Sequence, residues 1–399
     1  MNSADNTSDI WTVKRALDWT IGYLQRKGDE NPRVSAEWLI TEACGLSRID
    51  LYLNPERPLD RGELDVLHDY VARRGTGEPL QYITGEAPFR YLTIKVRPGV
   101  LIPRPETEVL VSEALACLPA AAKREARWSE ESSAKETEAI ASWKARIEAA
   151  MAEAEQEDLA QAEAEDGDPA RNDAERDSGA ADPSDPSDPD DPSSDTSLTS
   201  GNEGAGEPSD PSPAASLESS DEGAGMSPYF LVADVCTGSG CIACSIASER
   251  PDTRVIAVDV SDEAVALARQ NVADLHLDER IKVLQGDLGS PIPKRFLGRF
   301  SLVVSNPPYV PTRVLADVPQ EVSAFEPALA LDGGADGLDV FRRLAPWAHR
   351  ALKAGGSFVC ELHEEHLEDA ASIALECGFA SAKTVNDLAG RPRVLVCRR

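Results

Sequence analysis

The feature that most constrains the fold is a regular alternation of apolar runs with helical segments, which begins at Tyr229 and continues to the end of the chain. Strands separated by helices form an open, mostly parallel sheet with both faces covered. The pattern therefore predicts an α/β fold of the Rossmann-like kind for this part. The runs expected to form its strands are 230–235, 254–258, 281–285, 301–305, 356–362 and 394–397.

The chain begins with a helical pattern. Within residues 8–75, apolar positions recur at helical spacing, and Ser35 and Asp60 are expected to act as N-caps. Residues 77–105 differ, because the alternating run YLTIKV predicts a β-hairpin before a helix that opens near Glu106.

A long acidic segment separates this part from the predicted sheet. Residues 121–225 contain 29 Asp and Glu against 8 Lys and Arg, a net charge of −21, which leaves −9 of the total of −30 for the rest. Low apolar content, many prolines and like charge do not offset the entropy lost on ordering. We therefore expect 121–226 to be a low-complexity, largely disordered insertion, with transient helix at most in 122–165, whose removal leaves folding intact.

Composition indicates the cellular compartment and the kinds of partner to expect. No apolar run reaches the roughly 18 residues of a membrane span, and MNSADNTSDI lacks the basic and apolar regions of a secretory signal. Eight cysteines, mostly in apolar contexts, suit a reducing cytoplasm. Because the chain shows no basic footprint for phosphate backbones, we expect no direct nucleic-acid substrate.

Glycines follow the first predicted strand, and an aspartate follows the second. Gly238 and Gly240 stand in a strand-to-helix turn, where glycine lets a ligand approach the backbone closely. Asp259 directly follows the predicted strand in RVIAVDV, where its carboxylate is placed to accept both hydroxyls of a ribose. The pattern predicts an adenosine-containing cofactor but leaves a nicotinamide dinucleotide open. Ordinary turn glycines and a helix-capping aspartate are the structural alternative.

Two patterns raise the question of a metal. Cys236, Cys241 and Cys244 have a spacing known from iron–sulfur proteins, and His363 and His366 lie three apart. The cysteines fall on the loop that the cofactor would occupy and in an apolar helix, where cysteine acts as a small hydrophobe. The histidines lie in a polar stretch. We therefore expect no metal.

The motif Asn306-Pro307-Pro308-Tyr309 directly follows an apolar strand. The side-chain oxygen of Asn306 and the carbonyl oxygen of Pro307 are two acceptors that can hold both hydrogens of one NH2 group. The two prolines stiffen the turn, and Tyr309 offers a flat face for a planar amide or base. A proline-rich strand end with an exposed tyrosine is the alternative.

This motif predicts a chemistry as well as a ligand. An amide nitrogen is a poor nucleophile, because its lone pair is delocalised. Fixing both hydrogens aims that nitrogen at an electrophile, and orientation supplies much of the acceleration. The sulfonium methyl of S-adenosylmethionine is a strong enough electrophile, and the acceptors stabilise the positive charge that develops on nitrogen. The sequence therefore predicts a methyltransferase with Asn306, Pro307 and Tyr309 at its catalytic centre.

Nine blocks of sequence carry a family resemblance. The C-terminal part resembles class I S-adenosylmethionine-dependent methyltransferases, with a seven-stranded sheet. The chain outside 120–226 is similar to the protein-(glutamine-N5) methyltransferases of peptide chain release factors, the PrmC/HemK family. The blocks are GEPLQYITGEAPF (77–89), VLIPRPETE (100–108), TGSG (237–240), VDVS (258–261), GDL (286–288), VVSNPPYV (303–310), the segment 325–331, GGADGLD (333–339) and DLAGRPRV (387–394).

The resemblance implies a set of roles. The substrate would be the glutamine of the Gly-Gly-Gln motif in class 1 release factors, methylated at N5 in translation termination. Asn306 would contact both cofactor and glutamine, with Pro307, Pro308 and Tyr309 shaping the glutamine slot. The residues implied to hold S-adenosylmethionine are Thr237, Gly238, Ser239, Gly240, Cys241, Asp259, Asp287, Leu288 and Asn306.

The resemblance also divides the chain. Residues 1–76 would form a helical domain that docks the release factor, 77–105 a hairpin linker, and 106–120 with 227–399 the methyltransferase domain. One departure concerns Cys236, which stands where the family has glycine, a change that is tolerable only if its φ is negative. Arg104 and Glu106 are expected either to shape the site or to pair with each other.

Three competing functions remain open from the sequence. An N6-adenine methyltransferase acting on DNA or RNA shares the motif but should carry a base-flipping surface, which the sequence does not show. A nicotinamide-dependent oxidoreductase would use the glycine loop and leave Asn306-Pro307-Pro308-Tyr309 without a role. A non-catalytic module would bind the cofactor without turnover.

Overall fold

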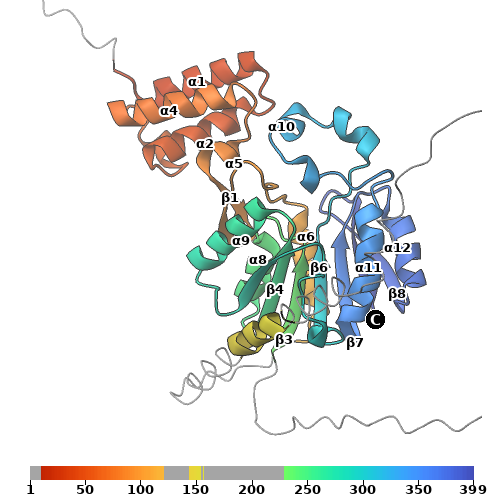
Figure 1. Cartoon of the computed structure of the whole chain (residues 1–399). Helices are drawn as coiled ribbons and strands as arrows, with labels where there is room; N and C mark the ends of the chain where they lie inside the picture. Colours follow the sequence, from red (N-terminus) through yellow and green to blue (C-terminus); the bar gives the residue numbers. More distant parts are fainter. Residues whose placement is uncertain (1–9, 121–142, 154–155, 157–228) are drawn as a thin grey trace, which may run out of the picture. The chain divides into compact units, whose positions relative to one another are not determined.

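A seven-stranded sheet forms the centre of the C-terminal part (Figure 1). The computed structural model describes residues 10–120, 143–153, 156 and 229–399. The strands of the sheet are β3 (Phe230–Val235), β4 (Thr253–Asp259), β5 (Ile281–Gln285), β6 (Phe300–Ser305), β7 (Leu352–Glu361), β8 (Ser381–Asn386) and β9 (Pro392–Arg398).

The strands follow the order β5-β4-β3-β6-β7-β9-β8. Neighbours from β5 to β7 run parallel, while β9 pairs antiparallel with both β7 and β8. The predicted α/β fold with a mostly parallel seven-stranded sheet is thus confirmed. The chain order reverses direction at β3, and ligands in such sheets bind at the carboxyl ends of the strands near that point.

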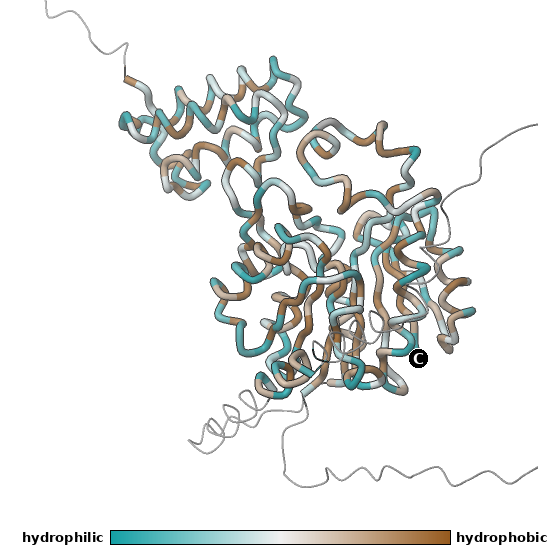
Figure 2. The backbone as a smooth tube through the Cα atoms, in the orientation of Figure 1, coloured by the Kyte–Doolittle hydropathy of each residue, from teal (hydrophilic) through white to brown (hydrophobic). Residues whose placement is uncertain are grey.

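Successive strand residues point to opposite faces, and each face has its own core. Val232 and Val255 belong to one cluster and Ala233 and Ile256 to the other. The apolar strands stand out in the hydropathy colouring of Figure 2. The first cluster includes residues of α6 (Thr107–Cys117), α8 (Cys241–Glu249) and α9 (Asp262–Asp274), and the second those of α11 (Asp339–Ala351) and α12 (Leu367–Glu376).

Part of the acidic segment contributes to the second core. Residues 143–153 are helical, and Trp143, Ile147 and Ala150 are buried among the apolar side chains of that face. Their spacing of four and three residues places them on one side of the helix. The expectation of transient helix at most is therefore wrong for residues 143–153, and the expectation that the segment can be removed without loss of folding stays a prediction. The remainder of 121–226, apart from Gln156, lies outside the described residues.

The N-terminal part has its own core of side chains from its helices and their connections. Asp60 caps α4 through a reciprocal capping box with Glu63, as expected, whereas Ser35 is not an N-cap. Asn31 takes the cap position of α2, and Ser35 donates to Asp29 instead. The helices are α1 (Val13–Lys27), α2 (Pro32–Cys44), α3 (Asp50–Leu53), α4 (Arg61–Arg74) and α5 (Leu80–Thr84).

The predicted hairpin follows these helices and is confirmed. It consists of β1 (Glu86–Phe89) and β2 (Leu92–Lys95), paired antiparallel, and α6 begins one residue after Glu106. Short helices η2 (Lys294–Phe296), η3 (Thr312–Asp317), α10 (Gln320–Ser323) and η4 (Ala328–Ala330) complete the described elements. Among the described residues, no helix is long and apolar enough to span a membrane.

Candidate active site

The loops that carry the predicted site residues leave neighbouring strands at the same edge of the sheet. Val235, the last residue of β3, is in register with Val258 of β4 and with Ser305 of β6. The hydroxyl of Ser305 also donates to the Val235 carbonyl over 2.7 Å. The glycine loop, Asp259 and Asn306 therefore meet at the carboxyl ends of three adjacent strands.

A fully buried acid, Asp234, fixes the glycine loop. Its Oδ2 accepts the Thr237 hydroxyl at 2.6 Å and the Ala243 amide at 3.1 Å. Burial raises the pKa of Asp234 to about 7, against the lowering effect of these two donors. Thr237 and Ser239 are themselves buried, so the structure assigns their side chains to holding the loop rather than to an open surface.

Two glycines of the loop adopt positive φ, and each has its own reason. Gly238 has a φ of +55°, and a Cβ there would meet no atom within 4 Å, so this position is open. Gly240 has a φ of +80°, and a Cβ there would come within 3.2 Å of the Ala268 side chain on α9. Gly238 thus presents open backbone, whereas Gly240 permits close packing at the start of α8.

Asp259 lies directly against this loop. Its Oδ2 accepts the Gly238 amide at 2.8 Å, and its Oδ1 accepts the Ser261 amide at 3.0 Å. Burial raises the pKa of Asp259, while the backbone donors lower it. A carboxylate oxygen accepts more than one hydrogen bond, so each oxygen retains capacity for a ligand hydroxyl.

The end of β5 adds a third loop beside Asp259. The Gly286 amide donates to the Asp259 carbonyl over 2.9 Å. Asp287 is exposed and pairs with Arg343, and Leu288 is half-buried with a φ of +51°. The loops thus offer an acceptor for hydroxyls, an open glycine and an apolar side chain, a set that fits an adenosine.

The cysteines are packing residues rather than ligands. Cys241 and Cys244 are buried on α8, and burial raises the pKa of both thiols. Cys236 has a φ of +61°, so the condition for tolerating it in place of glycine is not met and the loop is strained there. In the part of the chain that the structure describes, no group of three or more His, Cys, Asp or Glu is arranged to hold a metal.

Asn306 is anchored on its nitrogen side. Its Nδ2 donates to the Thr107 hydroxyl at the start of α6 over 3.2 Å. Neither Asn306 Oδ1 nor the Pro307 carbonyl accepts a hydrogen bond from any described residue. The Asn306 amide is therefore held through its NH2 group, and Asn306 Oδ1 and the Pro307 carbonyl oxygen remain as acceptors for a ligand.

A glycine-rich segment lies against the backbone of Tyr309. The Gly333 amide donates to the Val310 carbonyl over 2.8 Å, and a Cβ on Gly333 would come within 2.7 Å of the Tyr309 Cα. A Cβ on Gly337 would come within 2.5 Å of the Tyr309 carbonyl oxygen. These glycines of GGADGLD set the position of the motif, a role that sequence reasoning did not assign.

Glu361, the last residue of β7, is a buried acid that sequence reasoning missed. It is 1% exposed, and burial raises its pKa to about 7. The hydroxyls of Thr107 and Tyr309 lie beside its carboxyl and lower that pKa. The available signal was its place at the end of a buried strand, the same position that singled out Asp259.

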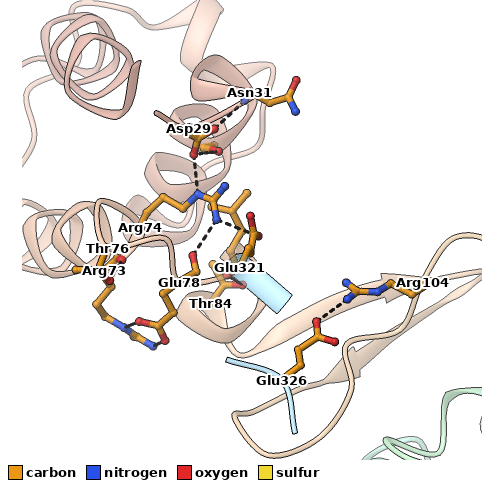
Figure 3. A network of polar contacts seen from close by, with 12 residues as sticks. Asp29, Asn31, Arg73, Arg74, Thr76, Glu78, Thr84, Arg104, Glu321 and Glu326 are labelled. Atoms are coloured by element: carbon orange, nitrogen blue, oxygen red, sulfur yellow. Dashed lines mark hydrogen bonds and ion pairs between the residues drawn. The ribbon is translucent and has the colours of Figure 1, made fainter. Parts of the chain in front are cut away.

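Arg104 and Glu106 do not pair with each other. Arg104 pairs with Glu326 over 2.6 Å (Figure 3). Glu106 lies 3.6 Å from Arg391. Glu326 belongs to the segment that follows Asn306-Pro307-Pro308-Tyr309.

The same segment is also joined to α4. Arg74 contacts Glu321 of α10 over 3.0 Å and Asp29 over 2.6 Å (Figure 3). Two arginines outside the sheet thus hold the chain that leaves the motif.

The fold and these loops define a class of protein, the methyltransferases built on a mostly parallel seven-stranded sheet. The family models agree: residues 15–85 match the PrmC N-terminal domain and residues 227–322 the methyltransferase small domain. The chain belongs to the release factor glutamine methyltransferase family.

Its relatives carry that identification over nearly the full length. The release factor glutamine methyltransferase of Geobacter sulfurreducens is 32% identical over 97% of this chain and 96% of its own. That of Koribacter versatilis is 30% identical over 97% and 99%. Among solved structures, a methyltransferase from Pyrococcus furiosus aligns with 43% of this chain and 75% of its own at 17% identity, with a TM-score of 0.32, too distant a likeness to add to this.

Proposed function

We propose that this protein transfers a methyl group from S-adenosylmethionine to the side-chain amide nitrogen, N5, of the glutamine in the Gly-Gly-Gln motif of class 1 peptide chain release factors. The observation that carries the proposal is the anchoring of Asn306. Because its Nδ2 is bonded to Thr107, its Oδ1 and the Pro307 carbonyl are the groups left to accept the two hydrogens of a carboxamide.

Chemistry follows from that arrangement. S-adenosylmethionine supplies an electrophilic methyl group on a sulfonium sulfur. Asn306 and Pro307 hold the glutamine NH2 by both hydrogens, which orients the nitrogen and stabilises its developing positive charge. Tyr309 and Pro308 shape the slot for the planar amide. The proton is lost once the nitrogen has become cationic, so no strong base is needed beforehand.

Cofactor binding is assigned to the adjoining loops. Asp259 would accept ribose hydroxyls with its remaining lone pairs, Gly238 would admit the ligand to open backbone, and Leu288 would supply an apolar wall for the base. Thr237, Ser239, Gly240 and Cys241 shape this loop from within. Asp287 borders it while paired with Arg343.

We assign release-factor docking to the helical N-terminal part. Arg74 supports this assignment, because it joins α4 to the segment that follows the motif at Glu321. Binding to these helices would therefore act on the chain that borders the glutamine slot.

The test is methyl transfer to a purified class 1 release factor. We expect one added methyl group on its Gly-Gly-Gln peptide by mass spectrometry, and none on a release factor whose glutamine is replaced by alanine. Isotope-labelled S-adenosylmethionine is then offered with DNA and RNA as well. Label incorporated into nucleic acid instead of the release factor would overturn the proposal in favour of an adenine methyltransferase.

A further inference from the structure

Thr107 and Glu361 meet beside Asn306 although they lie on different elements. Thr107 is the first residue of α6 and is 2% exposed, and Glu361 ends β7 and is 1% exposed. Residues Ser305 and Cys360, which precede Asn306 and Glu361, are in register on neighbouring strands. The fold therefore brings a hydroxyl and a carboxyl to the anchored side of the amide.

The hydrogen bond from Asn306 determines which way the Thr107 hydroxyl donates its own hydrogen. Its oxygen accepts a hydrogen bond from Asn306 Nδ2, so its own hydroxyl hydrogen can form a second hydrogen bond with an acceptor. The Glu361 carboxyl lies beside the Thr107 hydroxyl and can accept this second hydrogen bond. Glu361 Oε2 is buried and has no hydrogen-bond partner among the described residues. A buried carboxylate that lacks a full set of donors favours a hydroxyl turned toward it.

We propose that Thr107 and Glu361 are positioning residues, which fix the Asn306 amide with its nitrogen toward α6 and its oxygen toward the substrate amide. The two orientations of an asparagine amide have the same shape, so only hydrogen bonds can distinguish them. In the reverse orientation, an NH2 group would face the glutamine NH2, and the clamp would lose one acceptor. This inference rests on the proposed function and adds residues that touch neither substrate nor cofactor.

The direction of the hydrogen bonds that link Asn306, Thr107 and Glu361 depends on whether the Glu361 carboxyl is protonated. An ionised carboxylate accepts from Thr107 and keeps the amide in the productive orientation. A protonated carboxyl can donate to Thr107 instead, and the threonine proton then turns toward Asn306 and favours its oxygen.

Four titratable groups face Glu361 from the surrounding elements. Arg393 of β9 lowers its pKa, Glu106 raises it, and the Tyr309 hydroxyl lowers it. Glu361 in turn raises the pKa of Cys241 on α8, which is a small effect beside burial. Because the balance places the pKa of Glu361 at about 7, the rate should rise with pH through that value.

The experiment first establishes methylation of the release factor glutamine by the unaltered chain, since failure there would count against the proposed function alone. Thr107→Val removes the hydroxyl at nearly constant shape. We expect kcat to fall about tenfold, the worth of one hydrogen bond, with the Kd for S-adenosylmethionine changed less than about twofold. Thr107→Ser should recover most of the rate.

A matched control is Thr253→Val, which removes another buried threonine hydroxyl, bonded to the Arg250 carbonyl at the opposite end of β4. It should lower stability without changing kcat. If Thr107→Val unfolds, Thr107→Ser and Glu361→Gln carry the test, because both keep the shape of the site.

Glu361→Gln removes the titrating group. We expect the rise of kcat with pH near 7 to disappear in this variant, and the double variant with Thr107→Val to lose no more than Thr107→Val alone, since Glu361 acts through Thr107. Wild-type kcat in Thr107→Val, additive losses in the double variant, or an unchanged pH profile in Glu361→Gln would each overturn the inference.

Discussion

The loops after β3 and β6 leave neighbouring strands, yet they are built differently. The loop after β3 meets its ligand site through backbone and is held from within by Asp234. The loop after β6 presents one side chain, Asn306, held at its nitrogen by Thr107. A site made of backbone distributes recognition over several groups, whereas a site made of one oriented amide concentrates it. We therefore expect substitutions near β3 to weaken binding and substitutions near β6 to stop turnover.

The largest effect is expected at Asn306. Asn306→Ala removes an acceptor for the substrate NH2 and should lower kcat by about 10² to 10³, the range seen when one preorganised transition-state contact is lost. The Kd for S-adenosylmethionine should change only modestly. Single-turnover methyl transfer and calorimetry measure the two quantities.

Asn386→Ala is the matched control for this variant, since Asn386 lies exposed on β8. An Asn306→Ala variant that turned over as fast as this control would remove Asn306 from the chemistry and erase the contrast between the two loops.

Asp259 tests the loop after β3, because it ends the neighbouring strand β4 and accepts the Gly238 amide of that loop. Asp259→Ala removes the acceptor for ribose hydroxyls and two bonds to loop amides, and should weaken cofactor binding by about 1.5 to 3 kcal/mol. At saturating cofactor, kcat should be much less affected than in Asn306→Ala. Calorimetric titration with S-adenosylmethionine measures the loss.

Asp278→Ala changes an exposed aspartate and serves as its control. Equal affinity in the two variants would contradict the role given to Asp259.

Ile147 tests the helix that covers part of the second sheet face. It is 2% exposed on the helix of residues 143–153, belongs to the second core cluster of the sheet, and lines a hollow with Ile281 and Val283 of β5. Ile147→Ala should lower the free energy of unfolding by about 2 kcal/mol, measured by denaturant titration. Glu148→Ala on the exposed side of the same helix should change it little.

Both variants should keep the kcat and the cofactor Kd of the folded protein, which separates support of the sheet from action at either loop. Equal stability of the two variants would show that this helix does not contribute to the core.

The sequence predicted the buried strands well, because a buried parallel strand reads as a continuous apolar run. The predicted run 230–235 coincides with β3 and 281–285 with β5. The strand β8 was missed, since its residues are exposed or half-buried at the sheet edge and show no such run. The helix of 143–153 was expected to be transient, and its packing in the core was missed because a strongly acidic, alanine-rich surrounding conceals three apolar residues at helical spacing.

In the candidate site, too, the residues that belong to a local sequence pattern were predicted. Gly238, Asp259 and Asn306 are each marked by a motif, and they meet because neighbouring parallel strands end at one edge. Glu361 stands at the end of a buried strand, but neither it nor Thr107 belongs to a motif, since their role depends on contacts between α6, β6 and β7 that no local pattern encodes. Local sequence identifies the residues that meet the ligand better than the residues that hold them.

The smallest effect is expected at Cys236, where substitution tests the backbone strain of the loop after β3 alone. Its φ of +61° is a left-handed conformation that costs a side-chain-bearing residue about 1 to 2 kcal/mol. We expect Cys236→Gly to be more stable than Cys236→Ala by about 1 kcal/mol, because both lack the thiol and only alanine keeps the strain.

On the adjoining helix, the order should reverse. Cys244 lies within α8, so Cys244→Gly should be less stable than Cys244→Ala by about 1 kcal/mol. Denaturant midpoints of the four variants measure both differences. The same order at both positions would mean that the β3 loop is relaxed. Opposite orders would show that this chain keeps a backbone-made cofactor loop in its glycine conformation even with a cysteine in it, because Asp259 holds the Gly238 amide and Asp234 holds the Ala243 amide further along the loop and helix.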